Sequence, residues 1–156
     1  MVGKDELRQV MRLIPAPVAV VTIDLEGERL GLTVASLVSL SLEPPLVGAA
    51  VSRQAALHEL LHRAGDFGVS VLGAGQEHLA QHFARGVPPI ALWKGIAVRE
   101  GDGPPLLDDA VAWLRCRVWA EHDAGDHTLF VGEVIAAESG SAQHPLVYID
   151  RGYVSA

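Results

Sequence analysis

Four hydroxyl side chains are spread through residues 31–46, a run of strand-forming residues that ends at a double proline. They belong to Thr33, Ser36, Ser39 and Ser41. A hydroxyl both donates and accepts a hydrogen bond and carries no charge, so a row of them suits a ligand with phosphate oxygens and heteroaromatic edges. An ordinary half-buried strand with its hydroxyls facing water would leave the same pattern. The segment is a candidate binding site, with an ordinary strand as the alternative.

The composition sets the class of protein that could carry such a site. A chain of 156 residues, 49% of them hydrophobic, can build a full core, and we expect residues 1–156 to form a single domain. The formal net charge of −7 argues against nucleic acid as a partner. The charged start does not resemble a signal peptide, and no apolar run approaches the roughly 20 residues of a membrane helix. We expect a cytoplasmic protein with no membrane partner.

The cysteine and the paired histidines indicate no metal site. The single Cys116 lies in an apolar, strand-like run without a neighbouring His or second Cys, so we expect a buried core thiol. His58 and His62, and likewise His78 and His82, stand four apart, a spacing that can bind a metal. Neither pair has a third ligand nearby, so solvated helix faces are the expectation.

The elements that position these residues are mostly strands. Leu7, Val10, Met11 and Ile14 recur at helical spacing, and this predicts an N-terminal helix that ends before two prolines. Strands are expected at 18–23, 30–36, 46–51, 67–72, 112–121, 128–137 and 146–149, with short helices at 57–61 and 76–84 and a loop at 86–89. Many strands with short helices between them favour a mainly β fold with a closed or nearly closed antiparallel barrel.

The strand at 112–121 has two faces. Trp113, Arg115, Arg117 and Trp119 alternate with apolar residues, so they share the face opposite the core. Aromatic residues and arginine are enriched in protein interfaces. We therefore expect this row to contact a second subunit.

Seven short motifs are arranged in order along nearly the whole chain. They are PVAVVT at 17–22, GLTVAS at 31–36, SLSLEPP at 39–45, FGVSVL at 67–72, QEHLAQHFA at 76–84, GDH at 125–127 and PLVY at 145–148. Together they resemble the flavin reductase family with the FMN-binding split-barrel fold, the reductase components of two-component monooxygenases. The resemblance implies a homodimeric split β-barrel, a Greek-key antiparallel barrel with short inserted helices. It also implies an NAD(P)H:flavin oxidoreductase that transfers hydride from NADH or NADPH to FMN or FAD and often serves a separate monooxygenase.

The same resemblance implies which residues hold the flavin ring and its ribityl chain. It assigns these contacts to Thr33, Val34, Ala35, Ser36 and Ser39. Phe83 and Ala84 match a family segment that ends near the cofactor. Apolar contact and hydroxyl groups are what the ring system of a flavin requires.

The phosphate of the flavin is expected at the end of the next strand. There Ser52, Arg53 and Gln54 are consecutive, and the planar guanidinium of Arg53 would bind the phosphate. Family members commonly carry Ser or Thr after the basic residue, whereas this chain has alanines at 55 and 56. The phosphate would then depend on Ser52, on backbone amides at the start of the neighbouring helix, and on a further basic group such as Arg85.

His127 is the residue that the resemblance places beside the nicotinamide, as the catalytic residue of the site. Its role would be positioning, because hydride transfer needs no acid or base. A 2′-phosphate of NADP would need a basic group, for which Arg12, Arg85, Lys94 and Arg151 are candidates. Two other functions stay open, namely an electron-transfer flavoprotein that retains FMN without nicotinamide turnover, and a flavin-binding regulatory or storage domain.

Overall fold

The computed structural model describes residues 1–142 and 144–156, and within them the chain forms four helices and ten strands. The helices are α1 (Lys4–Met11), α2 (Ala56–Ala64), α3 (Glu77–Ala84) and α4 (Pro89–Leu92). The strands are β1 (Ala16–Pro17), β2 (Ala19–Leu25), β3 (Glu28–Val34), β4 (Val38–Leu42), β5 (Pro45–Ser52), β6 (Asp66–Val71), β7 (Ala112–Ala124), β8 (His127–Ser139), β9 (Leu146–Ile149) and β10 (Gly152–Ser155). The expected mainly β, antiparallel architecture is confirmed. The sequence did not predict α4, β1, β4 or β10.

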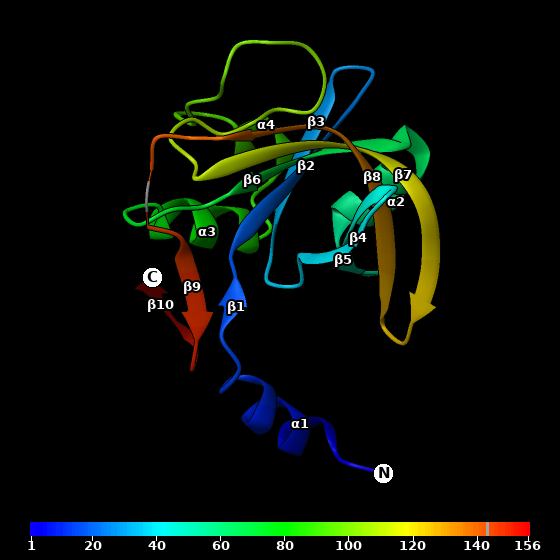
Figure 1. Ribbon diagram of the computed structural model, residues 1–156, viewed down its shortest axis with the longest axis vertical. Coiled ribbons are helices and arrows are strands. Elements are labelled where there is room, and N and C mark those ends of the chain that lie inside the picture. The colour runs from blue at the N-terminus through cyan, green and yellow to red at the C-terminus, as the bar shows by residue number, and fades with distance from the viewer. Residues whose placement is uncertain (143) are drawn as a thin grey trace.

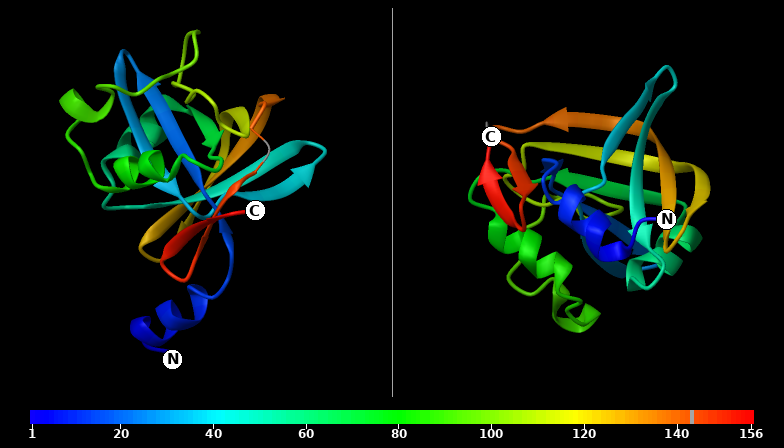
Figure 2. Two further views of the ribbon diagram at one scale, coloured as in Figure 1. Left: turned by 90° about the vertical axis from the view of Figure 1, so that its left-hand side faces the viewer. Right: turned by 90° about the horizontal axis from the view of Figure 1, so that it is seen from below.

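The strand order of the large sheet forces it to curl. Seven strands pair in the order β3, β2, β6, β7, β8, β5, β4, while β1, β9 and β10 form a second, small sheet. β3 and β4 are consecutive in the chain yet lie at opposite edges, joined only by residues 35–37. Such a link spans at most about 14 Å, whereas the edges of a flat sheet of this size lie about 29 Å apart. The sheet must therefore bend until its edges approach each other, and Figure 2 shows this curvature.

The side chain of Ser36 joins the two edges. Its hydroxyl donates a hydrogen bond to the carbonyl oxygen of Ala50 at 3.1 Å and accepts one from the N–H of Ala50 at 2.9 Å. Ala50 belongs to β5, the neighbour of the edge strand β4. One hydroxyl thus makes the pair of bonds that a neighbouring strand would otherwise make here. We call the place where the two sheet edges meet the seam.

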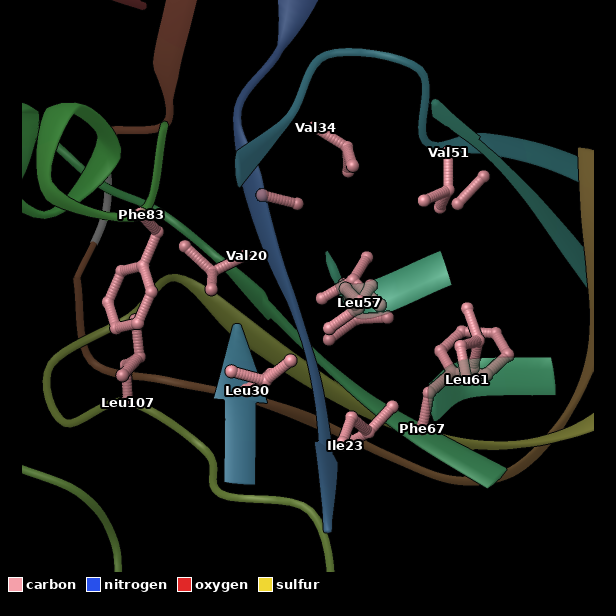
Figure 3. Close-up of a cluster of buried hydrophobic side chains, with 14 of the residues drawn as sticks. Val20, Ile23, Leu30, Val34, Val51, Leu57, Leu61, Phe67, Phe83 and Leu107 are labelled. Carbon is pink, nitrogen blue, oxygen red and sulfur yellow. The ribbon is translucent and has the colours of Figure 1, made fainter. Parts of the chain in front are cut away.

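The helix α2 fills the interior of the curled sheet. Its buried residues are Leu57, Leu60 and Leu61. Figure 3 shows Leu57 and Leu61 among the side chains of Ile23 and Phe67, which come from β2 and β6. The packed interior is a hydrophobic core, so a ligand has to bind outside it, at the seam or on a rim.

The cysteine prediction is confirmed. Cys116 on β7 is 1% exposed. Burial raises the pKa of its thiol to about 12. The thiol therefore stays protonated at neutral pH and has no role as a nucleophile.

Part of the aromatic and basic row on β7 is covered by the chain itself, so the prediction of an interface is wrong for Trp113. Arg115 is half-buried and Arg117 is exposed, so for them an interface stays a prediction. Trp113 is 8% exposed and donates from Nε1 to the carbonyl oxygen of Leu107 at 2.7 Å. Arg115 donates to the carbonyl oxygen of Pro104 at 3.2 Å. Trp119, further along the strand, is 55% exposed. The segment that precedes β7 covers the first half of this face, a contact between distant residues that the strand pattern alone does not contain.

Three of the four paired histidines contact other elements. The prediction of solvated helix faces is wrong for His58 and His82, which are half-buried, whereas His62 and His78 are exposed as expected. His58 Nε2 lies 2.7 Å from Thr128 Oγ1, His62 Nδ1 lies 2.8 Å from Glu121 Oε1, and His82 Nε2 lies 2.7 Å from the carbonyl oxygen of Leu92.

In residues 1–142 and 144–156, no three His, Cys, Asp or Glu side chains gather as metal ligands would. The helices in this part of the chain are also too short or too polar to cross a membrane.

The Ser36 bridge gives a first prediction. Ser36→Ala removes both bonds to Ala50 and leaves its N–H and carbonyl without these partners, so the free energy of unfolding should fall by about 1–3 kcal/mol. Ser39→Ala is the matched control, because Ser39 is exposed on β4. Urea unfolding followed by circular dichroism measures both. Equal stability of the two variants would contradict the bridging role.

Candidate functional site

The link between β3 and β4 is a stretch of backbone that could bind a ligand. The last ladder pair of β3 joins Val34 to Ala19, and the first of β4 joins Val38 to Gly48. Within the described chain, no backbone hydrogen bond involves the N–H or carbonyl groups of residues 35–37. Backbone groups of this kind must be satisfied by water or by a ligand. A flat heterocycle with alternating donors and acceptors along one edge is a suitable partner for them.

Two cavities adjoin this link. The smaller, of about 210 Å³, is lined by Val18, Thr33, Val34, Ala35, Ala84, Tyr148 and Tyr153. The larger, of about 600 Å³, is lined by α1 and the segment after it, by residues 35–38, and by Tyr148 and Arg151. Ala35 and Tyr148 line both. Together the cavities offer mostly apolar walls and a strip of unpaired backbone, which is typical of small-molecule sites.

Two of the hydroxyl groups predicted to contact a ligand make structural hydrogen bonds. Thr33 Oγ1 donates to the carbonyl oxygen of Ala80 at 2.6 Å and so fixes α3 against β3. Ser36 bridges the seam. Ser39 is exposed on β4, opposite Val47, and lines neither cavity. Thr33 and Ser36 keep free lone pairs, so they can still accept a hydrogen bond from a ligand.

The residues predicted at the end of α3 separate into core and surface. Phe83 is 2% exposed, and a Cβ on Gly31 would lie 2.8 Å from its ring, so its side chain belongs to the core. Ala84 is exposed and lines the smaller cavity next to Thr33. Arg85 is exposed at the C-terminal end of α3 and lines neither cavity.

A second group of predicted residues lies at the end of β5. Ser52 Oγ accepts a hydrogen bond from the N–H of Gln54 at 3.2 Å. The Arg53 guanidinium donates to Asp123 Oδ1 at 2.6 Å. The backbone N–H of Arg53 donates to the carbonyl oxygen of Asp126. Arg53 is thus held on the β7–β8 turn. An incoming phosphate would have to compete with Asp123, an exposed carboxylate.

Next to this group, α2 begins without a side-chain cap. The residue before its first turn is Ala55, and among the described residues no side chain caps the first N–H groups of the helix. A helix start leaves such donors free and is favourable for an anion. Ser52 and the start of α2 therefore fit a phosphate, and the alanines at 55 and 56 leave room for it.

His127 begins β8 directly opposite Ser52 of β5. Its ring is half-buried, and Nδ1 lies 2.7 Å from Asp126 Oδ1. Contact with His127 lowers the pKa of the Asp126 carboxyl, first through the hydrogen bond and then through its charge. The carboxylate holds one ring nitrogen of His127, so Nε2 is the one left for a ligand.

The fold connects these two groups through a short path. Ser36 of the link bonds to Ala50, which lies two residues before Ser52 in the same strand. The link, the end of β5 and His127 therefore follow one another in space along the seam. A flavin would fit this arrangement with its ring edge on the link and its phosphate toward the start of α2. When bound, a flavin supplies the two-electron chemistry that protein side chains lack.

The sequence did not predict two aromatic residues of the site. Tyr148 and Tyr153 pair across β9 and β10, with ring centroids 5.3 Å apart. Burial, and then the neighbouring Tyr148, raise the pKa of Tyr153. Tyr148 ends the PLVY motif, which marked it as part of the resemblance without giving it a role.

Comparisons with known proteins show the family to which the chain belongs. The family described as "Flavin reductase like domain" matches residues 11–156. The reductase component of 4-hydroxyphenylacetate 3-monooxygenase from Thermus thermophilus is 43% identical over 96% of this chain and 95% of its own length. The NADH-dependent FAD reductase of Streptomyces globisporus is 40% identical over 92% of this chain and 80% of its own.

A solved structure has the same fold over nearly the full length. BorF, the flavin reductase component of a bacterial two-component tryptophan halogenase, superposes with a TM-score of 0.91 at 35% identity, covering 98% of each chain.

The contact of Asp126 with His127 gives a second prediction. His127→Ala removes the hydrogen bond and the charge that lower the Asp126 pKa, so this pKa should rise toward the ordinary value of an aspartate. In the parent, the contact stabilises the fold above the unfolded-state pKa, and this contribution disappears as the pH falls through the lower, folded-state value. Carbon-detected NMR titration of the Asp carboxyls measures the change. His122→Ala, which removes an exposed histidine of β7, should leave the Asp126 titration unchanged. An unchanged titration in His127→Ala would refute the pairing.

Proposed function

This chain belongs to the family of flavin reductase like domains, and from that premise we propose that it transfers hydride from NADH or NADPH to FMN or FAD. The prediction of an NAD(P)H:flavin oxidoreductase is confirmed by relatives that are themselves NADH-dependent flavin reductases. The protein then supplies reduced flavin to a separate monooxygenase. Relatives described as reductase components of monooxygenases support this. We further propose that residues 1–156 form one split-barrel domain and that the protein is cytoplasmic.

The observation that supports this function best is the unpaired backbone at residues 35–37. These N–H and carbonyl groups lie beside two largely apolar cavities, next to Thr33, Ala84 and Tyr148. A flavin ring has a polar edge of alternating donors and acceptors and an otherwise apolar body, so it matches both features. In this proposal the link binds the ring, with Thr33, Val34, Ala35 and Ser36 in contact. Ser39 and Phe83 take no direct part, because one is on the far strand and the other is in the core.

The flavin phosphate is assigned to the end of β5 and the start of α2. Ser52, Gln54 and the first amides of α2 provide neutral donors. Arg53 contributes when it exchanges the Asp123 carboxylate for the phosphate. This exchange costs little free energy, because the ion pair with Asp123 is exposed. A phosphate held this way exchanges readily, which suits a flavin that is a substrate and not a prosthetic group. Arg85 has no part in this assignment.

His127 is assigned to the nicotinamide. It lies at the start of β8 opposite Ser52, and the family resemblance is what assigns it to the nicotinamide. Asp126 holds Nδ1 and leaves Nε2 free to donate or accept at the carboxamide of the nicotinamide. The residue positions the donor against the acceptor, which is the main protein contribution to hydride transfer.

We also propose a homodimer, with contacts beyond those expected on β7. α1 has no buried residue, and its apolar side chains Leu7, Val10 and Met11 are each more than half exposed, at 55%, 60% and 51%. Figures 1 and 2 show α1 standing away from the body of the molecule. Leu42 on the projecting β4 is 88% exposed. Apolar surfaces of this kind are covered in soluble proteins, and a second copy is the partner the family resemblance implies.

The reductase function is tested by steady-state oxidation of NADH and NADPH with free FMN and FAD. Turnover with at least one of the four combinations is expected. An electron-transfer flavoprotein would leave the nicotinamide unoxidised, and a regulatory domain would bind flavin without turnover.

The role of His127 has its own expected result. His127→Ala should lower kcat/KM for the nicotinamide substrate about 10-fold or more, equivalent to roughly 1.4 kcal/mol of lost positioning. Its affinity for FMN should stay within a few-fold of the parent, and the matched control His122→Ala should keep the parent values. Loss of flavin binding instead would refute the assignment to the nicotinamide.

The dimer contact is tested on α1. Replacing Leu7 and Val10 together by Lys places charges on the apolar face of α1. The mass measured by light scattering should then fall from that of a dimer to that of one chain, 16.6 kDa. Ile90→Lys is the control, because Ile90 on α4 is even more exposed, at 96%, but lies outside α1 and β4. A parent protein that is monomeric at micromolar concentration would overturn the proposal.

A further inference from the structure

The turn between β7 and β8 stands at the end of a long hairpin, and His127 is the first residue of β8 after it. β7 pairs with β6 only as far as Arg117, so within the described residues the rest of β7 pairs with β8 alone. β8 pairs with β5 up to the partners His127 and Ser52. The end of the hairpin therefore lacks a strand on one side, and the position of His127 depends on other contacts as well.

Two histidines of α2 provide such contacts, and Figure 1 shows α2 beside β7 and β8. His62 contacts Glu121 of β7, but these side chains are 57% and 30% exposed, and exposed pairs contribute little. His58, in the first turn of α2, is half-buried, and its Nε2 lies 2.7 Å from Thr128 Oγ1. Thr128 directly follows His127 in the chain. Of the two histidines, His58 is therefore the one that fixes the start of β8.

The surroundings of His58 hold its ring in one orientation. The ring packs edge-on against Phe130, with ring centroids 5.4 Å apart and an angle of 68° between the planes. Phe130 is 0% exposed and belongs to the core, so it is a rigid wall for the histidine. Thr128 is 5% exposed, and a hydroxyl buried to this degree needs a partner within the protein. His58 provides that partner, and loss of the contact would leave the hydroxyl without it.

The first turn of α2 thus contacts both halves of the proposed site. Its free amides are assigned to the flavin phosphate, and its His58 contacts the residue next to His127. Hydride transfer depends on the distance between the two bound ligands, so the two halves must be held at a fixed separation. We propose that His58 is a positioning residue of the reductase, which acts through Thr128 to hold His127 in place relative to α2. The inference rests on the proposed assignment of His127 to the nicotinamide.

Steady-state kinetics test this role from both partners of the contact. His58→Leu keeps much of the side-chain volume but removes the bond, so kcat/KM for the nicotinamide substrate should fall about 5-fold, with FMN affinity within a few-fold of the parent. Thr128→Val removes the same bond and should cause the same loss, and the double variant should lose no more. His58→Gln has an amide that can reach the hydroxyl, so it should restore most of the parent value. His78→Leu, an exposed histidine of α3, is the matched control and should keep the parent value.

A second background distinguishes positioning from a general effect on the fold. In His127→Ala, the group through which His58 acts is absent, so adding His58→Leu should leave kcat/KM for the nicotinamide substrate unchanged. A residue that only stabilises the fold would lower this value equally in both backgrounds. An equal loss in both backgrounds, or a His58→Gln variant as impaired as His58→Leu, would overturn the proposal.

The position of His127 can also be followed without turnover. The Asp126 pKa is lowered by contact with His127, so looser placement of His127 in His58→Leu should move this pKa toward the ordinary value of an aspartate. Carbon-detected NMR titration measures the change, and His78→Leu should titrate as the parent does. An Asp126 titration in His58→Leu identical to that of the parent would contradict the positioning role. A parent that oxidises neither NADH nor NADPH would refute the reductase function, and the titration would still decide whether His58 holds His127.

Discussion

The short link between β3 and β4 is the constraint on which the rest of the structure depends. Because residues 35–37 must connect opposite edges of a seven-stranded sheet, the sheet has to close around α2. The link itself then crosses between these edges, and within the described residues its backbone pairs with no strand. A backbone segment without ladder partners, held between packed elements, is a preorganised set of donors and acceptors. The same requirement that curls the sheet therefore leaves the strip of unpaired backbone that we propose as the binding surface.

Structural and binding roles are divided between side chain and backbone in this segment. The hydroxyls of Thr33 and Ser36 fix α3 and β5, so they hold the link in place. The backbone between them is left for the ligand. A protein that binds a flavin through main-chain groups can tolerate varied side chains there, such as Ala35, as long as the link keeps its length and its anchors. The site thus depends more on the path of the chain than on any single reactive residue.

Features that depend on near neighbours in the chain were predictable from the sequence. Alternation and helical spacing gave most strands, α2 and α3, and the buried Cys116. The seven motifs placed Thr33 to Ser36 and His127 near one site. Contacts between distant residues were out of reach, since no local pattern encodes the segment that covers Trp113, the Asp123 partner of Arg53, or the meeting of Arg12 with the β9–β10 turn. The apolar spacing of α1 correctly predicted a helix, but spacing alone does not tell whether the partner of its apolar face belongs to the same chain.

The most direct test of this account is a titration of the ¹⁵N-labelled protein with riboflavin, monitored by amide NMR shifts. Riboflavin has the ring but no phosphate, so it reports ring contacts alone. Our account predicts that the amides of Ala35, Ser36 and Leu37 shift most, with smaller changes at Thr33 and Ala84 and little change at Ser39. Shifts confined to other parts of the protein, with the 35–37 amides unmoved at saturation, would contradict the claim that the unpaired link binds the flavin ring.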